Sequence, residues 1–335
     1  MSVRPLSIDG PFYDELEAGQ VLPSQPAVTI DAGMAALYQS IMGERLSLAL
    51  DDRLSAAVTG GATRLVSPGL ALGLSIGQST VATRRVIANL FYRDVRLHRQ
   101  VHLDASLHTV VTVKALADAA ARGDRGARGK VLLGITTTAD DETMASFERC
   151  ALLPVRGGLL PGHADPMPSL DQTLVLDDYV ASVPPAWRRD QLEPAAPWAL
   201  GECRHDPMRD RIEMAGALVR LTQNQAMVHR DPGASPYDQP LVYGGHVVGL
   251  AQASLSRVCT GLATVIGWHS CDHVAPAFEG DVVEFTHELV AEQRLDGGAA
   301  LRAFRVVASR AGAEPTVLLS WTPVVLVGPA ETQEP

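Results

Sequence analysis

The sequence predicts an α+β protein made of two similar halves, each containing an apolar helix followed by about four strands. Residues 68–80 and 246–258 contain almost no charged side chains, which is typical of helices that are covered on nearly all sides. Each of these segments precedes stretches in which apolar residues alternate, as they do in strands. The same order of elements returns after roughly 170 residues, which indicates a duplicated domain.

The first half begins with residues 12–22, which read as a short strand and turn. A helix is predicted over residues 29–43, because Asp31 can cap its start and apolar residues recur at helical spacing (Met34, Leu37, Tyr38 and Ile41). Residues 51–63 read as a loop with a glycine pair, and the first apolar helix follows. Strands are then expected at residues 86–95, 106–116, 130–138 and 143–155.

The second half repeats this order after a segment of different character. Seven prolines interrupt residues 156–198, which are therefore predicted to form a surface linker with a short helix near residues 176–182. A helical segment over 214–228, a loop and the second apolar helix follow, with strands at 264–273, 281–294, 301–309 and 316–327. We divide the chain into an N-terminal repeat (1–155), a linker (156–198) and a C-terminal repeat (199–335).

The composition limits the classes of function. The chain has 335 residues, of which 46% are hydrophobic and 20% charged, as in a well-packed globular protein. Its net charge of −10 and the lack of Lys/Arg runs argue against a nucleic-acid partner. No apolar signal segment or membrane span is evident, so we expect a cytoplasmic protein without a membrane partner. The cysteines lack CxxC spacing and are expected to be mostly buried thiols (Cys150, Cys203, Cys259 and Cys271).

Residues 221–258 hold the strongest candidate site. Asn224 and His229 lie five residues apart, before a turn rich in Pro, Gly and Asp. The sequence VYGGH at residues 242–246 then opens the second apolar helix. The backbone N–H groups at a helix start can bind a developing negative charge. Two polar side chains suited to proton handling therefore precede a possible anion site.

A rival reading concerns WHSCDH at residues 268–273. His269, Cys271 and His273 fall on one face of a predicted strand and are zinc-ligand types. Successive same-face residues are too far apart to meet at one ion, and no fourth ligand is evident, so we predict no metal. The lack of P-loop, dinucleotide-binding and GxSxG motifs argues against nucleotide and serine-hydrolase chemistry.

The motifs resemble those of a known family. A long apolar helix wrapped by an antiparallel sheet is the hot-dog fold, and two in one chain make a double hot dog. The sequence pattern QNxAxVH…VYGGH, with PAFEGD at residues 276–281, resembles the motifs of the MaoC-like (R)-specific enoyl-thioester hydratases. It looks most like the mesaconyl-CoA hydratase (β-methylmalyl-CoA dehydratase) branch, and ALYQSIMGER and VIANLFYRDVRL in the first half agree with that branch.

Hydration of an unsaturated thioester needs a base, an oxyanion site and an acid. His229 is the one residue of the motif that titrates near neutral pH, so we assign it both proton roles. The resemblance places Asn224 where the family usually has Asp, and its amide can hold the water. Gly244 and Gly245, or His246, would form the oxyanion hole with their backbone N–H groups, beside Tyr243 as a substrate-binding residue. No cofactor is implied.

The first half lacks a histidine at the matching turn, and LVSPG at residues 65–69 replaces VYGGH, so we expect it to be non-catalytic. A dicarboxylic acyl group would need an arginine, for which Arg64, Arg93 and Arg96 are candidates. The resemblance implies an acyl-CoA or acyl-carrier-protein thioester as partner, and a homodimer. Conjugate addition of an amine, dehydration of a carrier-bound chain, thioester hydrolysis and non-catalytic thioester binding stay open as alternatives.

Overall fold

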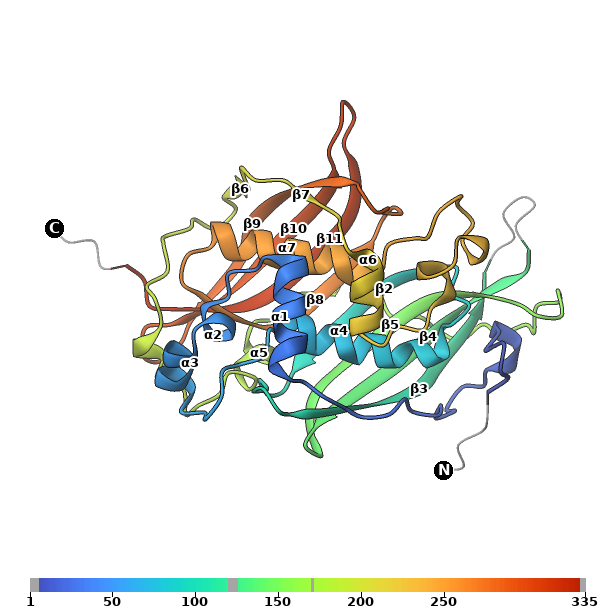
Figure 1. The fold of residues 1–335 in the computed structure, drawn as a ribbon, viewed down its shortest axis with the longest axis horizontal. Coiled ribbons are helices and arrows are strands. Elements are labelled where there is room, and N and C mark those ends of the chain that lie inside the picture. The colour runs from blue at the N-terminus through green and yellow to red at the C-terminus, as the bar shows by residue number, and fades with distance from the viewer. Residues whose placement is uncertain (1–5, 120–125, 170–171, 332–335) are drawn as a thin grey trace.

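The computed structural model describes residues 6–119, 126–169 and 172–331 of the chain. Its central feature is one antiparallel sheet, in which the strands follow the order β1-β3-β4-β5-β2-β8-β11-β10-β9-β6, with β7 paired to β9 (Figure 1). The N-terminal half supplies β1 (Val28–Thr29), β2 (Ala88–Leu97), β3 (Ser106–Asp118), β4 (Arg128–Ala139) and β5 (Glu142–Pro154). The C-terminal half supplies β6 (Cys203–His205), β7 (Asp210–Arg211), β8 (Leu262–His273), β9 (Val282–Arg294), β10 (Ala300–Arg310) and β11 (Thr316–Val327).

Strands β2 and β8 join the two halves. They pair antiparallel, with Tyr92 opposite Cys271. On either side of this seam the strand order is mirrored, because β5, β4 and β3 follow β2 as β11, β10 and β9 follow β8. The chain is therefore an α+β protein with two equivalent half-sheets, as the sequence predicts.

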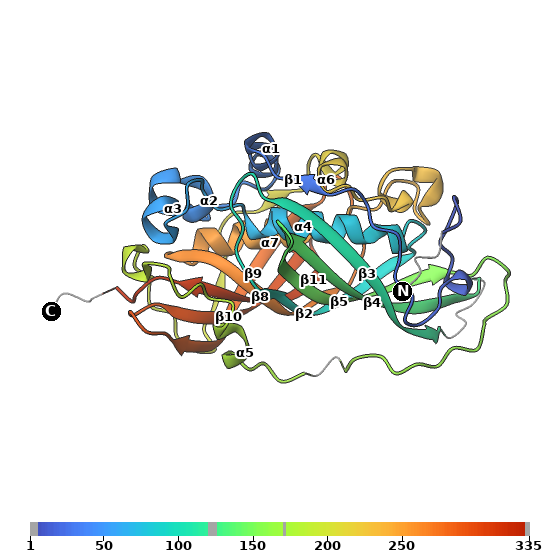
Figure 2. The same ribbon diagram turned by 90° about the horizontal axis from the view of Figure 1, so that it is seen from below.

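The helices cover one face of the sheet in two layers (Figure 2). The apolar helices α4 (Pro68–Ser79) and α7 (Gly244–Val258) lie directly on the sheet, and most of their residues are buried. The outer layer lies over these two helices and consists of α1 (Ala32–Met42), α2 (Ser47–Leu50), α3 (Asp52–Thr59) and α6 (Ala215–Leu221). The two apolar helices are thus enclosed on all sides, which explains why their sequences carry almost no charge.

The segment that joins the halves runs under the opposite face of the sheet (Figure 2). It contains α5 (Asp177–Val180), which confirms the short helix predicted near residues 176–182. Leu176, Tyr179 and Trp187 pack with Ile266 and Leu326 of the C-terminal half in a core cluster of their own. The linker thus buries the outer face of the half-sheet that carries α7.

Most elements confirm the sequence predictions. Asp31 caps α1 by accepting a hydrogen bond from the Met34 N–H at 2.8 Å. Helix α4 covers the predicted range, and α7 starts two residues before the predicted 246–258. The eight long strands differ from the predicted ranges by only a few residues at each end. Alternation and uninterrupted apolar runs were sufficient for these assignments.

Three local predictions are wrong. Residues 12–22 contain a 3-10 turn at Tyr13–Glu15 and, in place of the predicted short strand, a single antiparallel bridge from Val21 to Thr112 of β3. Residues 51–63 contain helix α3, which Asp51 caps by accepting from the Arg53 and Leu54 N–H groups and which Gly60 ends in the left-handed conformation. The helical segment predicted over 214–228 ends at Leu221, because Gln223 adopts a positive φ of 57°.

Gly77 allows the two halves to approach closely. A methyl group at position 77 of α4 would lie 1.6 Å from the carbonyl oxygen of Thr222, at the end of α6. No side chain fits at that distance, and a backbone carbonyl cannot rotate away as a side chain can. The absence of a side chain at position 77 therefore allows the segment that follows α6 to lie against α4.

Gly77→Ala is expected to destabilise the protein by about 2–3 kcal/mol, because overpacking against backbone outweighs the gain in helix propensity. Gly73→Ala is the matched control on the same helix, since its methyl group would lie 3.3 Å from the movable Thr222 Cγ2. Urea unfolding of the two variants measures the difference. Equal effects at positions 73 and 77 would contradict the close approach.

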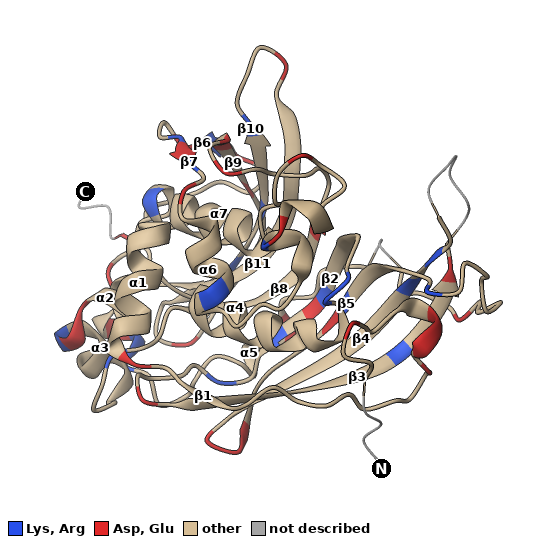
Figure 3. Ribbon diagram, turned by 45° about the vertical axis from the view of Figure 1, so that its right-hand side comes forward, with Lys and Arg blue, Asp and Glu red and all other residues tan. Residues whose placement is uncertain are grey.

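Charge and cysteine placement agree with a globular protein. Residues of both charges are scattered over the elements of the ribbon (Figure 3), and α4 contains no charged residue. Cys150, Cys259 and Cys271 are buried free thiols, as expected, whereas Cys203 is exposed. In the part of the chain that the structure describes, no helix has the length and apolar character needed to cross a membrane.

Candidate active site

The segment between α6 and α7 carries the candidate site and is anchored on the N-terminal half. The Gln225 N–H donates to Thr80 Oγ1 at 2.8 Å, and its side-chain Nε2 donates to Gln25 Oε1 at 2.9 Å. The Met227 N–H donates to the Arg84 carbonyl at 2.8 Å. These contacts place Asn224 and His229 of the C-terminal half over residues of the N-terminal half.

Asn224 is buried and its oxygen is already used. Its Oδ1 accepts a hydrogen bond from the Ala226 N–H at 2.9 Å, and its backbone carbonyl accepts from Arg230 Nε at 3.0 Å. We expected the amide both to donate to and to accept from a water molecule. The structure leaves mainly the Nδ2 hydrogens for that purpose, so Asn224 is a donor in this arrangement.

His229 is oriented as a proton acceptor. Its Nδ1 lies 2.8 Å from the Leu241 carbonyl oxygen, which can only accept, so Nδ1 carries the hydrogen and Nε2 presents a lone pair. Burial lowers the pKa of His229 to about 4, and the hydrogen bond to Leu241 opposes this shift only partly. Among the described residues Nε2 has no hydrogen-bond partner. A neutral imidazole with a free Nε2 is the form that a general base requires.

The start of α7 provides backbone donors beside this base. The rings of His229 and Tyr243 lie 5.7 Å apart, and Tyr243 is the residue before the first turn. Gly244 and Gly245 open the helix, and their N–H groups donate to no acceptor among the described residues. The His246 N–H differs from our expectation, because it donates to the Tyr243 carbonyl at 2.8 Å. The two glycine amides are therefore the free donors.

The His246 side chain is also fully buried, at 0% exposure, and neither ring nitrogen has a partner among the described residues. Burial lowers the pKa of His246 to about 4. The ring is thus a neutral core group at the first turn of α7.

His273, which the sequence analysis considered only in the rejected zinc reading, lies beside the start of α7. Its ring occupies the space beside Gly244, where a methyl group would lie 2.4 Å from Cε1. It also packs edge-on against Tyr92 at 5.9 Å, and its Nε2 is buried without a partner among the described residues. Burial lowers the pKa of His273 to about 4. His273 is therefore a neutral ring that closes one side of the helix start.

The rival group of His269, Cys271 and His273 does not share one face. The pairing of β11 with β8 skips one residue, since Thr322 pairs with Ser270 and Pro323 with Trp268. This bulge turns His269 outward, where its Nε2 lies 2.9 Å from the Gln172 carbonyl oxygen in the linker. The shared face assumed from strict alternation is therefore wrong.

Arg149 was not identified from the sequence. It lies on β5 directly opposite Tyr92, is 3% exposed, and donates to Asn89 Oδ1 at 2.6 Å and to Ser79 Oγ at 3.0 Å. Its charge lowers the pKa of both His229 and His273. The sequence feature that could have identified Arg149 is its position among the inward-facing residues of β5, between the buried Phe147 and Ala151.

Comparisons with known proteins agree with this fold and motif. No family model matches the chain. The solved structure of RV0216, a conserved hypothetical protein from Mycobacterium tuberculosis with a double hotdog fold, is 35% identical and covers 96% of this chain and 99% of its own, with a TM-score of 0.82. A structure described as a MaoC domain dehydratase from Chloroflexus aurantiacus has a TM-score of 0.82 at 20% identity, and covers 98% of this chain and 100% of its own.

Two characterised relatives match in sequence. Mesaconyl-CoA hydratase from Cereibacter sphaeroides is 26% identical over 323 residues, which are 93% of this chain and 92% of that protein. β-Methylmalyl-CoA dehydratase from Chloroflexus aurantiacus is 24% identical over 311 residues, which are 89% and 87% of the two chains. The chain belongs to the MaoC-like hydratases and dehydratases. The expected double hot-dog fold and hydro-lyase class are thereby confirmed.

The arginines proposed from the sequence are already paired in this MaoC-like protein. Arg93 donates to Asp272 Oδ1 at 2.7 Å. Arg96 pairs with Asp94 at 2.6 Å and stacks on Tyr179 of the linker at 4.0 Å. Arg64 pairs with Asp52 at 3.1 Å and lines a pocket of the N-terminal half. The structure brings none of the three to His229, because each is held by an acid elsewhere.

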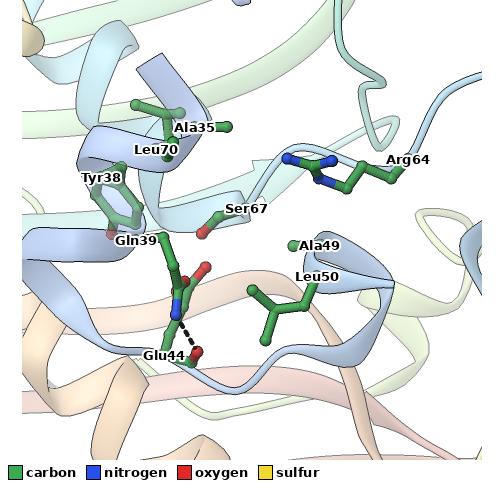
Figure 4. A pocket seen from close by; sticks show the side chains of 10 residues that line it. Ala35, Tyr38, Gln39, Glu44, Ala49, Leu50, Arg64, Ser67 and Leu70 are labelled. Atoms are coloured by element: carbon green, nitrogen blue, oxygen red, sulfur yellow. Dashed lines mark hydrogen bonds between the residues drawn. The ribbon is translucent and has the colours of Figure 1, made fainter. Parts of the chain in front are cut away.

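The N-terminal half of this MaoC-like chain has a pocket at the corresponding place (Figure 4). It has a volume of about 270 Å³ and is lined by Tyr38, Gln39, Glu44, Arg64 and Ser67, together with apolar residues (Ala35, Ala36, Ala49, Leu50 and Leu70). Glu44 follows α1 as Asn224 follows α6, and its Oε2 accepts from Gln252 Nε2 at 2.7 Å. The lining contains a carboxyl group but no histidine, so no neutral-pH base faces this pocket.

Burial raises the pKa of Glu44, and hydrogen bonds from Ser67 and Gln252 offset this only partly. The folded state therefore binds the Glu44 proton more tightly than the unfolded chain does. Its stabilising contribution is complete below the ordinary pKa of 4.5 and is lost as the pH rises through the folded value.

Glu44→Gln is expected to be more stable than the unmodified protein at pH 7–8, with a difference that shrinks toward about pH 4, because the amide needs no proton to stay neutral. Thermal unfolding at a series of pH values measures this. Glu314→Gln, in the exposed turn before β11, is the control and should show no such trend. A difference for Glu44→Gln that does not change with pH would contradict the buried neutral acid.

Proposed function

We propose that this protein reversibly adds water across the double bond of an α,β-unsaturated acyl-CoA thioester. The observation that carries the proposal is the neutral His229 near the start of α7. Within the described part of the chain, its Nε2 and the N–H groups of Gly244 and Gly245 have no hydrogen-bond partner. Family membership supports the reaction class. The geometry supports His229 as the base and the two glycine amides as the oxyanion site.

In the hydration direction, Nε2 of His229 takes a proton from water while the water oxygen bonds to the β-carbon. The π electrons of the double bond move toward the thioester oxygen, which becomes an enolate held by the Gly244 and Gly245 amides. The His229 imidazolium then gives the proton to the α-carbon, and the thioester carbonyl re-forms. Asn224 Nδ2 donates to the water oxygen and orients it. One oxyanion donor is typically worth about 3 kcal/mol in the transition state.

The low pKa of His229 suits the second half of this cycle. An imidazolium in a buried site is a strong acid, so it returns its proton readily to a carbon atom that is a poor base. The developing negative charge on the enolate favours the imidazolium while it exists. Base and acid roles can therefore alternate on one side chain.

For the substrate we propose a short, branched dicarboxylic acyl group, such as that of mesaconyl-CoA or β-methylmalyl-CoA. The support is the match of the two relatives that carry those substrates in their names. Two cavities flank the 222–243 segment. Arg84 and Arg85 line one of about 400 Å³, and Arg220 and Arg230 line the other, of about 280 Å³. These arginines suit the phosphates of CoA. An acyl-carrier-protein thioester is the alternative carrier, and a homodimer stays a prediction.

His229→Ala is expected to lower kcat/KM for hydration of mesaconyl-CoA by roughly 10²–10⁴-fold, because the general base and acid are removed together. The measurement is the gain of one water mass on the acyl-CoA, followed by liquid chromatography and mass spectrometry. His98→Ala removes an exposed histidine of the other half and serves as the control. A His229→Ala variant that keeps full activity would refute the assignment, and an inactive unmodified protein would refute the proposed function.

The pH dependence gives an independent test of the neutral histidine. Since the pKa of His229 is lowered to about 4, kcat/KM should stay nearly constant from pH 8 down to about 5 and fall below that. A solvated histidine would instead lose activity below about 6.5, its ordinary pKa. Initial rates in buffers of constant ionic strength measure the profile, and a limb near 6.5 would contradict a buried base.

A further inference from the structure

We infer that Arg149 binds the distal carboxylate of a dicarboxylic acyl group and selects such substrates over monocarboxylic ones. The inference rests on the proposed function and adds the residue that determines its specificity. It also replaces Arg64, Arg93 and Arg96, whose guanidinium groups are paired elsewhere.

The first observation is a buried cation without an acid. Arg149 is 3% exposed, and its two hydrogen bonds go to the neutral side chains of Asn89 and Ser79. Among the described residues no carboxylate lies within 4.0 Å of it, whereas three other arginines with little-exposed side chains are each paired with one (Arg93 with Asp272, Arg257 with Asp206 and Arg302 with Glu292). A buried guanidinium that lacks a counter-charge is costly, which favours a site that an anionic ligand completes.

The second observation is a pair of unused donors at the same place. Arg149 Nη2 has no partner among the described residues, since only Nε and Nη1 are engaged. Nδ2 of the neighbouring Asn89 is buried and also lacks an acceptor there, although its Oδ1 accepts from Arg149. A carboxylate brings two acceptor oxygens and one negative charge, which match these donors and the unpaired cation.

The third observation is the position of Arg149 relative to the proposed reaction centre. On the sheet, Arg149 pairs with Tyr92, and Tyr92 pairs with Cys271 on its other side. The Tyr92 ring packs against His273, which lies beside Gly244 at the start of α7. The rings of Tyr92 and His273 thus connect Arg149 with the start of α7. The positive charge of Arg149 also lowers the pKa of His229.

A purely structural role is the competing explanation. Ser79 is the last residue of α4, and a cation at a helix C-terminus is favoured by the helix dipole. Loss of that role would impair the fold and the handling of every acyl group alike. Loss of a carboxylate-binding role would impair dicarboxylic ligands selectively, so the comparison of two ligands distinguishes the two explanations.

The experiment measures binding of two saturated acyl-CoA molecules of equal chain length, succinyl-CoA and butyryl-CoA, by titration calorimetry. The unmodified protein is expected to bind succinyl-CoA at least 10-fold more tightly, and Arg149→Gln should remove this preference. Arg149→Lys keeps the positive charge but lacks the planar guanidinium with its paired donors, and should retain part of the preference. Arg93→Gln is the matched control, since Arg93 is equally buried but paired with Asp272, and it should leave the preference unchanged.

Two results would overturn the inference: no preference for succinyl-CoA in the unmodified protein, or a preference that persists in Arg149→Gln. If Arg149→Gln does not fold, the unmodified protein and Arg149→Lys still decide the question. Binding of saturated ligands does not depend on turnover. A protein that prefers succinyl-CoA but hydrates no unsaturated thioester would therefore refute the proposed function and leave the carboxylate site standing.

Discussion

The antiparallel pairing of β2 with β8 is the contact on which the rest of the structure depends. It makes one sheet from two half-sheets and sets Arg149, Tyr92 and Cys271 side by side across the seam. The sheet is thereby wide enough to carry α4 and α7 together. Because Gly77 lets the end of α6 approach α4, the segment with His229 lies over the N-terminal half. The candidate catalytic groups thus belong to the C-terminal half, and contacts with the N-terminal half hold their segment in place.

Burial is the common physical cause of the site's chemical properties. It lowers the pKa of His229 and His273 to about 4, and it raises the pKa of Tyr243 well above its ordinary value. All three groups are thus neutral at pH 7. The positive charge of Arg149 acts on each of them, and that of Arg230 also acts on His229. In such surroundings, hydrogen bonds to a developing enolate are stronger than in water. The same burial explains why an unpaired guanidinium here points to an anionic ligand.

Sequence reading was successful where the signal is local. The apolar runs of α4 and α7 and the alternation of the long strands identify the fold, and the Asn224–His229–VYGGH spacing identifies a compact candidate site. Helix α3 was missed because its polar sequence lacks an apolar run, although Asp51 and Gly60 are a cap pair. Arg149 was missed because its partners Asn89 and Ser79 lie 60 and 70 residues away. Arginines chosen without knowledge of such long-range contacts turned out to be paired elsewhere.

The duplication explains how the two halves came to differ. In each half a carboxamide or carboxyl residue follows the outer helix, Asn224 after α6 and Glu44 after α1. Only the C-terminal half has a histidine in the turn after this residue and a glycine pair at the start of its apolar helix, and Glu44 is instead enclosed with Gln252 and Ser67. In a dimer of two identical single hot-dog chains, the same arginine would have to occur in both halves. A fused chain can keep Arg149 on β5 and a tryptophan, Trp321, on the equivalent β11. One half can then supply proton transfer while the other supplies the charge that we propose recognises the substrate.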